Sequence, residues 1–525
     1  MNLSENCLFL KMRNKMKLNS VFGSFDTITK FIEIKDFDLF DTNAIEANVE
    51  SWLNYYTYYH EKMHYYQFTS TSLGLFITCL EDLKLDSIIP FINELDFVPP
   101  FIDCVEEHEK EFNQKIYLMR DKLGISKYQT KELDYIKVLF DSLSEAELLM
   151  WIMEGGFSEK ELELITKNTP FTNYGIRKIY SFISEYYKLA GKDLFTFYSS
   201  FLKDFEKSKI QIPSPQFYFV ELDNGVSFGY NHILEAQARY CELTRLISNV
   251  RRFGDNNIHK SVKNILTKQD YYQEAYNIFK SIVVNIERCD QYFIIFVFCL
   301  ICDYAINIPI PQIPQLEESY ASLLDLTIML PAVRFFHICF AVNEVIIKCD
   351  TCMKLQKNDI FNPRALSDWN KAIDIIYEGI NKKTGYSSPI TKAKAFIENE
   401  YKFTDHLSFD YDNIVFLEAC KTRLQYPLFF INPELFRLID RKTYIELTNK
   451  HQAPIMQLNK EIRCYHENTD DEMIQGFWFK CIISRYASKL FWGTECNPDL
   501  AQFFDSNKEV FEKAIFDKYG KVKPF

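Results

Sequence analysis

The chain has 525 residues, too many for one compact core, so we expect two or three subdomains. Gly and Pro are scarce, at 15 and 17 residues, which argues against β-sandwiches and low-complexity linkers. Hydrophobic residues make up 47% of the chain, with 47 Phe and 32 Tyr, and this composition favours packed helices. The formal net charge of −12 offers no basic footprint, so we expect no nucleic-acid partner.

The N-terminal half begins with a short β element and continues as helices. Apolar and charged residues alternate between Thr29 and Phe40, which predicts a strand or a pair of edge strands. A helical pattern follows over about residues 43–84, with a break near 70–74. Further helices are predicted at about residues 102–123, 130–153, 158–168, 172–190 and 192–207.

Helices also dominate the prediction for the rest of the chain. They are expected at about residues 225–250, 270–306 and 315–348, and Pro331 should kink or split the last of these. Beyond Cys352 the elements should become shorter, with the best linker at residues 381–389. A final helix is predicted over about residues 498–518.

We expect neither a secretion signal nor a membrane span. Four basic residues interrupt the first 18 residues, so these lack the apolar run of a signal peptide. The longest uninterrupted apolar run, Tyr292 to Ile301, is about half of the ~20 residues that a bilayer span requires. We therefore expect a cytoplasmic protein whose 14 Cys are mostly buried thiols.

His60 and His64 stand four residues apart within a stretch of helical apolar spacing. On a helix this spacing places both imidazoles on one face, one turn apart, where they can bind one cation. Glu61 projects beside them, where a carboxylate can take a proton from an activated water. The alternative is a pair of polar rings on a Tyr-rich surface, but only nine His occur in the chain. The segment therefore predicts a zinc site with a catalytic base.

A zinc site of this kind needs a third protein ligand and leaves a fourth position for water. One known solution is a third His six residues after the second, with a Gly midway between them. This chain has Ser70 and Gln67 at those places, so that solution fails. We therefore expect a carboxylate on a second helix.

The run from His60 to Gln67, followed by Ser70, Thr71 and Gly74, resembles the gluzincin branch of the zinc metallopeptidases. It also looks like the large intracellular proteins that carry HExxHxxQ and a later Leu-Glu-x-x-Ala segment, which Leu234 to Ala238 matches here. The resemblance covers two short patches. It departs from better-known gluzincins in the wide separation of the patches and in Arg239, which replaces an acidic residue.

The resemblance implies that Glu235 is the third ligand, that the metal is Zn²⁺, and that the reaction is hydrolysis of a protein or peptide substrate. Small Ala236 and Ala238 beside Glu235 would permit close approach of the two helices. An alternative is a surface Glu235 that pairs with Arg239 four residues on. Rivals for the third position are Glu81, Glu106, Glu107 and His108.

Further candidate catalytic residues lie near Glu235. His232 is one helical turn before it, so its ring could donate to a developing oxyanion. Tyr230 and Tyr240 are other candidate donors, and Gln67 could orient the substrate or a ligand. For each of them the alternative is an ordinary packed polar side chain.

Two Cys-x-x-Cys pairs, Cys299/Cys302 and Cys349/Cys352, could supply thiolates to a structural zinc site. The first pair lies in an apolar helical run and the pairs are far apart, so we interpret these Cys as packing residues. The Glu-x-x-His spacing within the HExxH segment is also half of a di-iron motif. No other His in the chain has Glu three residues before it, which argues against a di-iron protein.

The predicted fold is a mainly α, multi-helix, zincin-like metallopeptidase core with a small β element before the active-site helix and a helical C-terminal elaboration. Residues 1–252 should form the core with both ligand helices. Residues 253–380 should form a helical subdomain packed on that core, and residues 381–525 a C-terminal α-rich subdomain.

The predicted function is that of a zinc-dependent intracellular endopeptidase, with Glu61 as the base. The size of the chain and the expected lack of secretion suggest selectivity for few partners, a toxin or defence role in a microbe, and a regulatory protein partner. Two alternatives stay open: a non-catalytic helical interaction protein with a structural or vestigial metal, and a zinc hydrolase that acts on a non-peptide amide.

Overall fold

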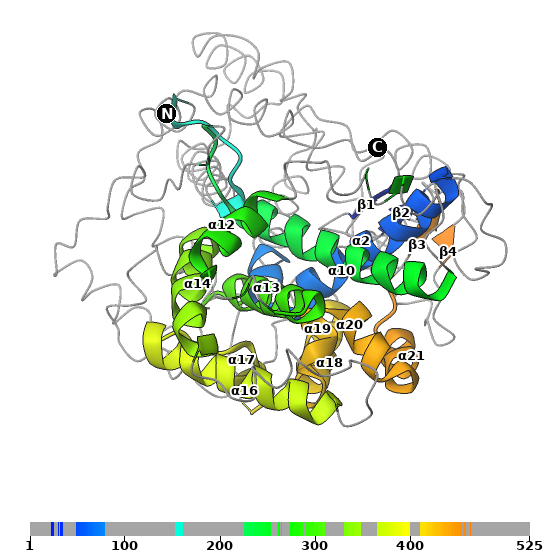
Figure 1. Ribbon diagram of the computed structural model, residues 1–525. Helices are drawn as coiled ribbons and strands as arrows, with labels where there is room; N and C mark the ends of the chain where they lie inside the picture. Colours follow the sequence, from blue (N-terminus) through cyan, green and yellow to red (C-terminus); the bar gives the residue numbers. More distant parts are fainter. Residues whose placement is uncertain are drawn as a thin grey trace, which may run out of the picture.

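The structure is a computed structural model (Figure 1). With short gaps, it describes residues within 23–34, 49–78, 153–160, 222–264, 273–309, 330–347, 365–398 and 410–463. These residues form a mainly α-helical protein, as the composition predicts. The helices are α2 (Val49–Ser70), α10 (Tyr230–Phe253), α12 (Glu274–Ile282), α13 (Gln291–Ile306), α14 (Pro331–Ile347), α16 (Ala365–Thr384), α17 (Pro389–Glu398), α18 (Asp410–Gln425), α19 (Pro427–Ile431), α20 (Pro433–Ile439) and α21 (Arg441–Lys450).

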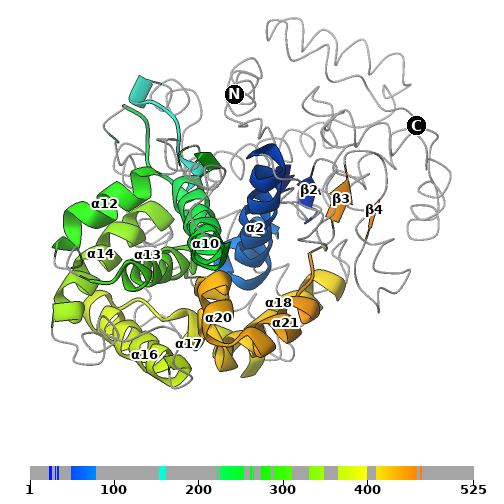
Figure 2. The same cartoon turned by 45° about the vertical axis from the view of Figure 1, so that its right-hand side comes forward.

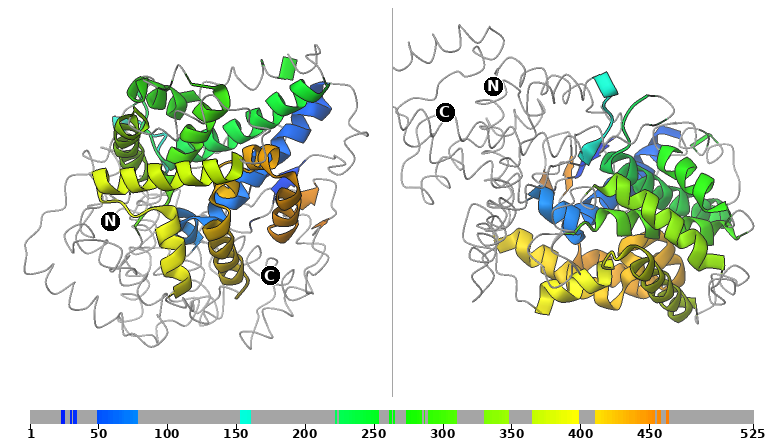
Figure 3. Two further views of the ribbon diagram at one scale, coloured as in Figure 1. Left: turned by 60° about the horizontal axis from the view of Figure 1, so that its bottom comes forward. Right: turned by 90° about the vertical axis from the view of Figure 1, so that its left-hand side faces the viewer.

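The helices are layered around α2 and α10. Figure 2 shows α2 between the small sheet and α10, and these two helices pack directly on each other. Beyond α10, the layers continue through α13 and α14 to α16. The views in Figure 3 show the yellow and orange C-terminal helices gathered on one side of α2 and α10. The pair α2 and α10 is therefore supported from several directions.

A small sheet of four strands covers the face of α2 that is turned away from α10. β1 (Gly23–Phe25) is antiparallel to β2 (Ile32–Ile34), which pairs in parallel with β3 (Ile455–Gln457), and β4 (Ile462–Arg463) closes the order. The strand predicted within residues 29–40 is thus confirmed as β2. Its partner β3 comes from far along the chain and was not predicted.

Helix α2 forms because no Gly or Pro interrupts residues 49–70, and its neighbours bury much of its length. The predicted break after it is confirmed, since the chain bends at Thr71 and is helical again over residues 72–78. Gly74 permits this geometry, because a Cβ there would lie 2.2 Å from the carbonyl oxygen of Phe68. The side chain and backbone of Ser72 bond to Ile308 and Asn307, which anchors the bend to the end of α13.

Helix α13 is the centre of the core. Asp290 caps its start by accepting from the Tyr292 N–H, and nearly every residue of the helix is buried. The apolar run from Tyr292 to Ile301 is therefore a core helix, as its length predicts. Within the part of the chain that the structure describes, none of the helices combines the length and apolarity that crossing a bilayer demands.

Three short helices follow one another between residues 427 and 450, and local signals separate them. Pro427 and Pro433 occupy the first turns of α19 and α20. Asn432 caps α20 and Asp440 caps α21 with side-chain hydrogen bonds. These caps turn the chain sharply so that α19 and α20 pack beside α10 and α13.

Several predicted elements need correction. The single helix expected at 270–306 is two helices, because the chain leaves the helical path between Ile282 and Gln291. Pro331 is the first residue of α14, where a kink or a split was predicted, and the segment before Leu330 lies outside the described residues. Helix α16 is 20 residues long where shorter elements were expected. The predicted linker at 381–389 is the end of α16, a tight turn at Gly385 (φ 73°) and the start of α17.

Other predictions concern parts of the chain outside the described residues. They include almost all of the helices expected between residues 102 and 207, the region 315–329, and the final helix at 498–518. The division of the chain at residues 252 and 380 stays a prediction.

Candidate metal centre

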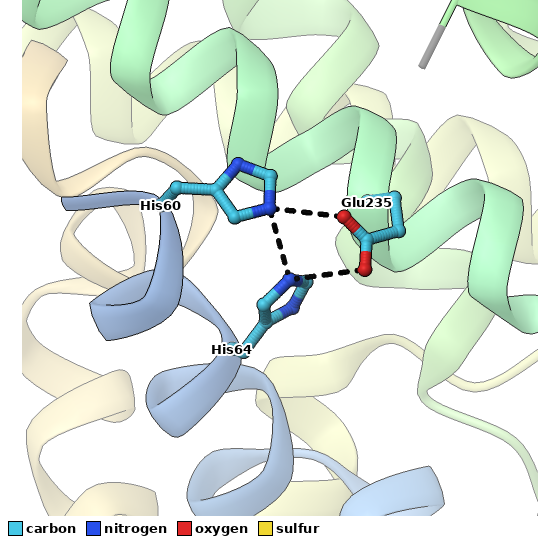
Figure 4. Close-up of side chains that lie close together, drawn as sticks. All are labelled: His60, His64 and Glu235. Carbon is cyan, nitrogen blue, oxygen red and sulfur yellow. Dashed lines mark hydrogen bonds and ion pairs between the residues drawn. The ribbon is translucent and has the colours of Figure 1, made fainter. Parts of the chain in front are cut away.

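Helices α2 and α10 bring three of the predicted ligands together. His60 and His64 project from α2 towards Glu235 on α10 (Figure 4). Nε2 of His60 lies 2.9 Å from Oε2 of Glu235 and 3.2 Å from Nε2 of His64. Nε2 of His64 lies 3.4 Å from Oε1 of Glu235. Among the described residues, these three form the group of His, Cys, Asp and Glu side chains that could hold a metal ion.

The spacing of these atoms fits a tetrahedral cation. Zinc bonds of about 2.0–2.1 Å in a tetrahedron place neighbouring ligand atoms about 3.3–3.4 Å apart. The two Nε2 atoms are 3.2 Å apart, and each faces a different oxygen of Glu235, His60 at 2.9 Å and His64 at 3.4 Å, which is close to that edge length. Both His are buried, whereas the side chain of Glu235 is 26% exposed, so the centre approaches solvent on the α10 side.

The hydrogen bond behind His64 shows which of its ring nitrogens faces the centre. Nδ1 of His64 lies 2.8 Å from Oε1 of Gln67, and an amide oxygen can only accept. Nδ1 therefore carries the proton, and Nε2 turns its lone pair towards His60 and Glu235. This is the tautomer that a metal ligand needs.

A second acidic residue lies behind His60. Nδ1 of His60 is 3.5 Å from Oε2 of Glu242, which is buried on α10 and also bonds to Arg239. The alternative pairing of Arg239 with Glu235 is therefore wrong in this structure. A carboxylate behind a ligand His holds the proton on the rear nitrogen and raises the basicity of the front one.

The combined donor set can accommodate a cation. One ligand atom from each of His60, His64 and Glu235 lies within 4.8 Å of the other two. Either a hydrogen on Nε2 of His60 or a metal ion must stand between these otherwise repelling lone pairs. Two imidazoles, one carboxylate and a side open to solvent match the donors of catalytic zinc sites. The residues present therefore fit a zinc ion.

The pKa values of His60 and Glu235 also indicate that the group favours a positive charge. Burial opposes charge on His60, but the carboxylates of Glu235 and Glu242 outweigh it and raise the pKa of His60 to about 10. Burial also opposes charge on Glu235, yet His64 and His60 hold the pKa of its carboxyl well below the usual value. A proton therefore supplies the positive charge when no metal does.

Glu61 is buried beside the centre without being one of the three converging ligands. Burial raises the pKa of its carboxyl, and the neighbouring His60 and His64 oppose that rise. A carboxyl with a raised pKa accepts and releases a proton closer to neutral pH than an exposed one. Its position and its pKa suit the predicted base.

The predicted oxyanion donors are buried on α10. His232 is fully buried, its Nδ1 accepts from the Gly229 N–H, and its Nε2 lies 3.1 Å from Oε2 of Glu274. Tyr230 is also buried. Catalytic roles for His232 and Tyr230 stay predictions. Tyr240 packs against Tyr276 and Phe298 in the core.

Of the Cys pairs and the rival third ligands, only one Cys pair lies within the described residues. Cys299 and Cys302 are buried in α13, and burial raises the pKa of the Cys302 thiol, which suits the predicted packing role. Cys349 and Cys352 lie outside the described residues, as do the rival third ligands Glu81, Glu106, Glu107 and His108.

Sequence reasoning missed Glu242. The available signal was its place seven residues after Glu235, which is two helical turns along the same face of α10. It also left the role of Gln67 open between a substrate contact and a packed side chain. The structure places Gln67 behind His64 as its hydrogen-bond partner.

Comparison with known proteins adds no family to this description. No family model matches the chain, and no curated protein or solved structure matches it either.

Proposed function

We propose that the chain is a zinc-dependent hydrolase that cleaves peptide bonds. The observation that carries the proposal is the convergence of His60, His64 and Glu235 with a buried carboxyl, Glu61, beside them. Metal sites that serve only structure are closed by four protein ligands, whereas the described residues supply three, which leave one position for water. The resemblance of the HExxHxxQ segment to gluzincins supports the peptide bond as the target.

Each residue has a distinct task in this proposal. His60, His64 and Glu235 hold the ion, which when bound supplies Lewis acidity that lowers the pKa of water and polarises a carbonyl. Glu61 takes a proton from the attacking water and later gives it to the departing amine nitrogen. Its buried carboxyl, with a raised pKa, favours both transfers near neutral pH.

The small sheet supports an extended peptide as substrate. Strand β1 is an outer strand within the described part of the sheet and packs against α2. Phe25 at its end lies beside His64, with 6.3 Å between the ring centroids. An outer strand can add an extended peptide by main-chain hydrogen bonding, and this one would deliver it next to the ligand helix.

The decisive experiment is the variant Glu61→Gln. It should keep its zinc, measured by atomic absorption after gel filtration, because Glu61 is not a ligand. Cleavage of a peptide library should fall by about 100- to 10,000-fold, because the base is lost. Glu418→Gln changes a partly exposed carboxylate of α18, so it is the matched control and should cleave like the wild type.

Two results would contradict the proposal. Cleavage by Glu61→Gln at the wild-type rate would show that Glu61 is not the base. A wild-type chain that binds no zinc would show that the three residues do not form a zinc site. A zinc-loaded wild type that cleaves no peptide would leave the alternatives, a structural metal or a non-peptide amide substrate.

We further propose that the enzyme works in the cytoplasm on few protein substrates, as a microbial toxin or defence effector under a regulatory partner. This selectivity is supported by the length of the chain, 525 residues, which is large for a single small metal centre. Terminal labelling of new cleavage sites in cell lysate should reveal a few cut proteins. Indiscriminate cleavage of many proteins would contradict this selectivity.

A further inference from the structure

We infer that Gln237 is a positioning residue for the metal centre, acting on His64 through Gln67. The inference deepens the proposed function and rests on its metal site. A chain of two buried side-chain amides, Gln237 and Gln67, runs from the core to the rear of the His64 ring. We call these two side chains the amide relay.

Gln237 forms the inner part of the amide relay. Its side chain is fully buried on α10, and its Nε2 donates to the backbone oxygen of Ile431 at 3.0 Å. The same nitrogen lies 3.5 Å from the backbone oxygen of Cys299. Its Oε1 accepts from Nε2 of Gln67 at 2.9 Å. The contacts of Gln237 are thus with the core and with Gln67, not with the metal ligands.

Gln67 forms the outer part. Its Nε2 donates to Oε1 of Gln237 and also to the backbone oxygen of Leu234, at 3.0 Å. Its Oε1 is left to face Nδ1 of His64 at 2.8 Å. Both amide hydrogens are therefore directed away from the ring.

The direction of both amides is fixed because backbone carbonyls cannot become donors. A flipped Gln237 would turn its oxygen against the carbonyls of Ile431 and Cys299. A flipped Gln67 would turn its oxygen against the carbonyl of Leu234 and against Oε1 of Gln237. Each flip would leave acceptors facing acceptors in a buried site, which is costly.

His64 is consequently restricted to one tautomer. A proton on Nε2 would leave two lone pairs, those of Nδ1 and of Gln67, facing each other. The amide relay therefore keeps the proton on Nδ1 and the lone pair of Nε2 at the centre. His60 differs, because a carboxylate, Glu242, stands behind its ring. A neutral amide, Gln67, thus fixes the tautomer of His64, whereas a carboxylate, Glu242, stands behind His60.

The test uses the full chain and the variants Gln67→Met, Gln237→Met and the double variant, since Met keeps the length of Gln without its polar atoms. Zinc affinity is measured by competition with a chelator. Gln67→Met should weaken binding by about 10- to 100-fold, and Gln237→Met by part of that factor. If Gln237 acts through Gln67, the double variant should bind no more weakly than Gln67→Met.

A spectroscopic readout separates positioning from packing. In protein loaded with Co²⁺, the Nδ1–H protons of His60 and His64 give paramagnetically shifted NMR signals. The signal assigned to His64 should exchange faster with solvent in Gln67→Met and in Gln237→Met, while that of His60 stays unchanged. If Gln67→Met does not fold, the comparison of Gln237→Met with the wild type carries the test, because that variant leaves Gln67 in place behind His64.

Asn249→Leu is the matched control. Asn249 is a buried amide on α10 that bonds across to Tyr56 of α2, yet it has no contact with the amide relay. Its loss should leave zinc affinity and both proton signals as in the wild type. Comparable loosening by Asn249→Leu and Gln237→Met would overturn the inference, because any weakening of the interface would then suffice.

Other results also decide the question. Wild-type affinity in Gln237→Met, or losses that add up in the double variant, would overturn the role of Gln237. A wild-type chain that binds no Zn²⁺ would overturn both the centre and this inference. A chain that binds Zn²⁺ with the expected pattern but cleaves no peptide would overturn only the proposed hydrolysis.

Discussion

Three side chains with metal-ligand atoms meet between α2 and α10, and the residues behind them keep them there. Gln67 fixes the proton of His64, and Glu242 stands behind His60. Arg239 holds Glu242 in place from the same helix. The chemistry of the centre therefore depends on buried residues that would not themselves touch a metal.

The contribution of Glu242 can be measured by its replacement with Gln. Glu242→Gln keeps the shape of the side chain but loses its charge, so His60 becomes a weaker ligand. We expect zinc affinity to fall by about 10- to 100-fold in chelator competition. Glu274→Gln is the matched control, because Glu274 also pairs with a buried His, namely His232 of α10, which is not one of the proposed ligands. Equal affinity of Glu242→Gln and wild type would show that His60 needs no carboxylate.

Single residues differ in how well the sequence predicts them. The four-residue spacing of His60 and His64 fixes their common face, so both ligands were predicted from helical geometry alone. Glu235 needed the resemblance to gluzincins, because spacing carries no information about a second helix 171 positions after His64. Gln237 gave no signal, since its role depends on the carbonyl of Ile431 from another part of the chain.

At the scale of elements, a polar cluster ties α2, α10 and α20 together. Arg245 of α10 bonds to Tyr55 and Tyr59 of α2, and its guanidinium lies 4.3 Å from the centre of the Tyr59 ring. It also bonds to Glu434 of α20 at 2.9 Å, and Arg437 joins the same carboxylate at 2.7 Å. This cluster holds the two ligand helices at a second point along their contact.

The cluster makes stability depend on pH. Burial alone would raise the pKa of Glu434, but Arg245 and Arg437 outweigh burial and hold it at about 2. Since the folded pKa is below the unfolded one, the stabilisation is complete above about pH 4.5 and disappears as the pH falls towards 2. A shift of this size corresponds to up to about 3 kcal/mol of unfolding free energy.

Replacement of Glu434 by Gln should remove that dependence. Glu434→Gln should unfold more easily than the wild type in urea at pH 7, and the difference should shrink between pH 4.5 and 2. Glu418→Gln, which breaks the partly exposed ion pairs of Glu418 with Lys421 and Lys450, should change stability by less than about 1 kcal/mol at any pH. A difference from the wild type that stays constant down to pH 2 would contradict the role of the Glu434 charge.

Elements were predicted where local pattern decides them. Helices α2 and α10 follow from apolar spacing, and the bend at Thr71 follows from the nearby Ser and Gly residues. The interval between α12 and α13 was missed because the apolar pattern runs through it. The strand β3 was missed because three residues gain their structure only by pairing with Ile32 to Ile34.

At the scale of the whole molecule, the proposed ion would join two helices that are distant in sequence. A ligand that binds only the folded chain stabilises it, by about 2.7 kcal/mol when its free concentration is 100 times its dissociation constant. We therefore expect Zn²⁺ to raise the midpoint of thermal unfolding and a chelator to lower it. The double variant His60→Ala/His64→Ala should show no such shift. An equal shift in that variant would place the stabilising zinc elsewhere, for example on Cys.

The fold class was predictable from composition, but the packing order was not. Scarce Gly and Pro and abundant Phe and Tyr indicate a helical protein. That α13 lies at the core, between α10 and α14, follows from contacts that no local pattern encodes. The buried pair Asp303 and Arg423, which joins α13 to α18 at 2.7 Å, is of the same non-local kind.

The parallel pairing of β2 with β3 has a consequence for how the molecule is made. Ribosomes add about 5–20 residues per second, so tens of seconds separate the emergence of residue 235 from that of residue 457. For most of that interval the nascent chain holds every proposed ligand but lacks the Ile431 carbonyl, and β3 follows later still. We therefore expect the proposed centre to gain its full set of supporting contacts only late in synthesis, and a chain truncated between residues 235 and 431 to lack them.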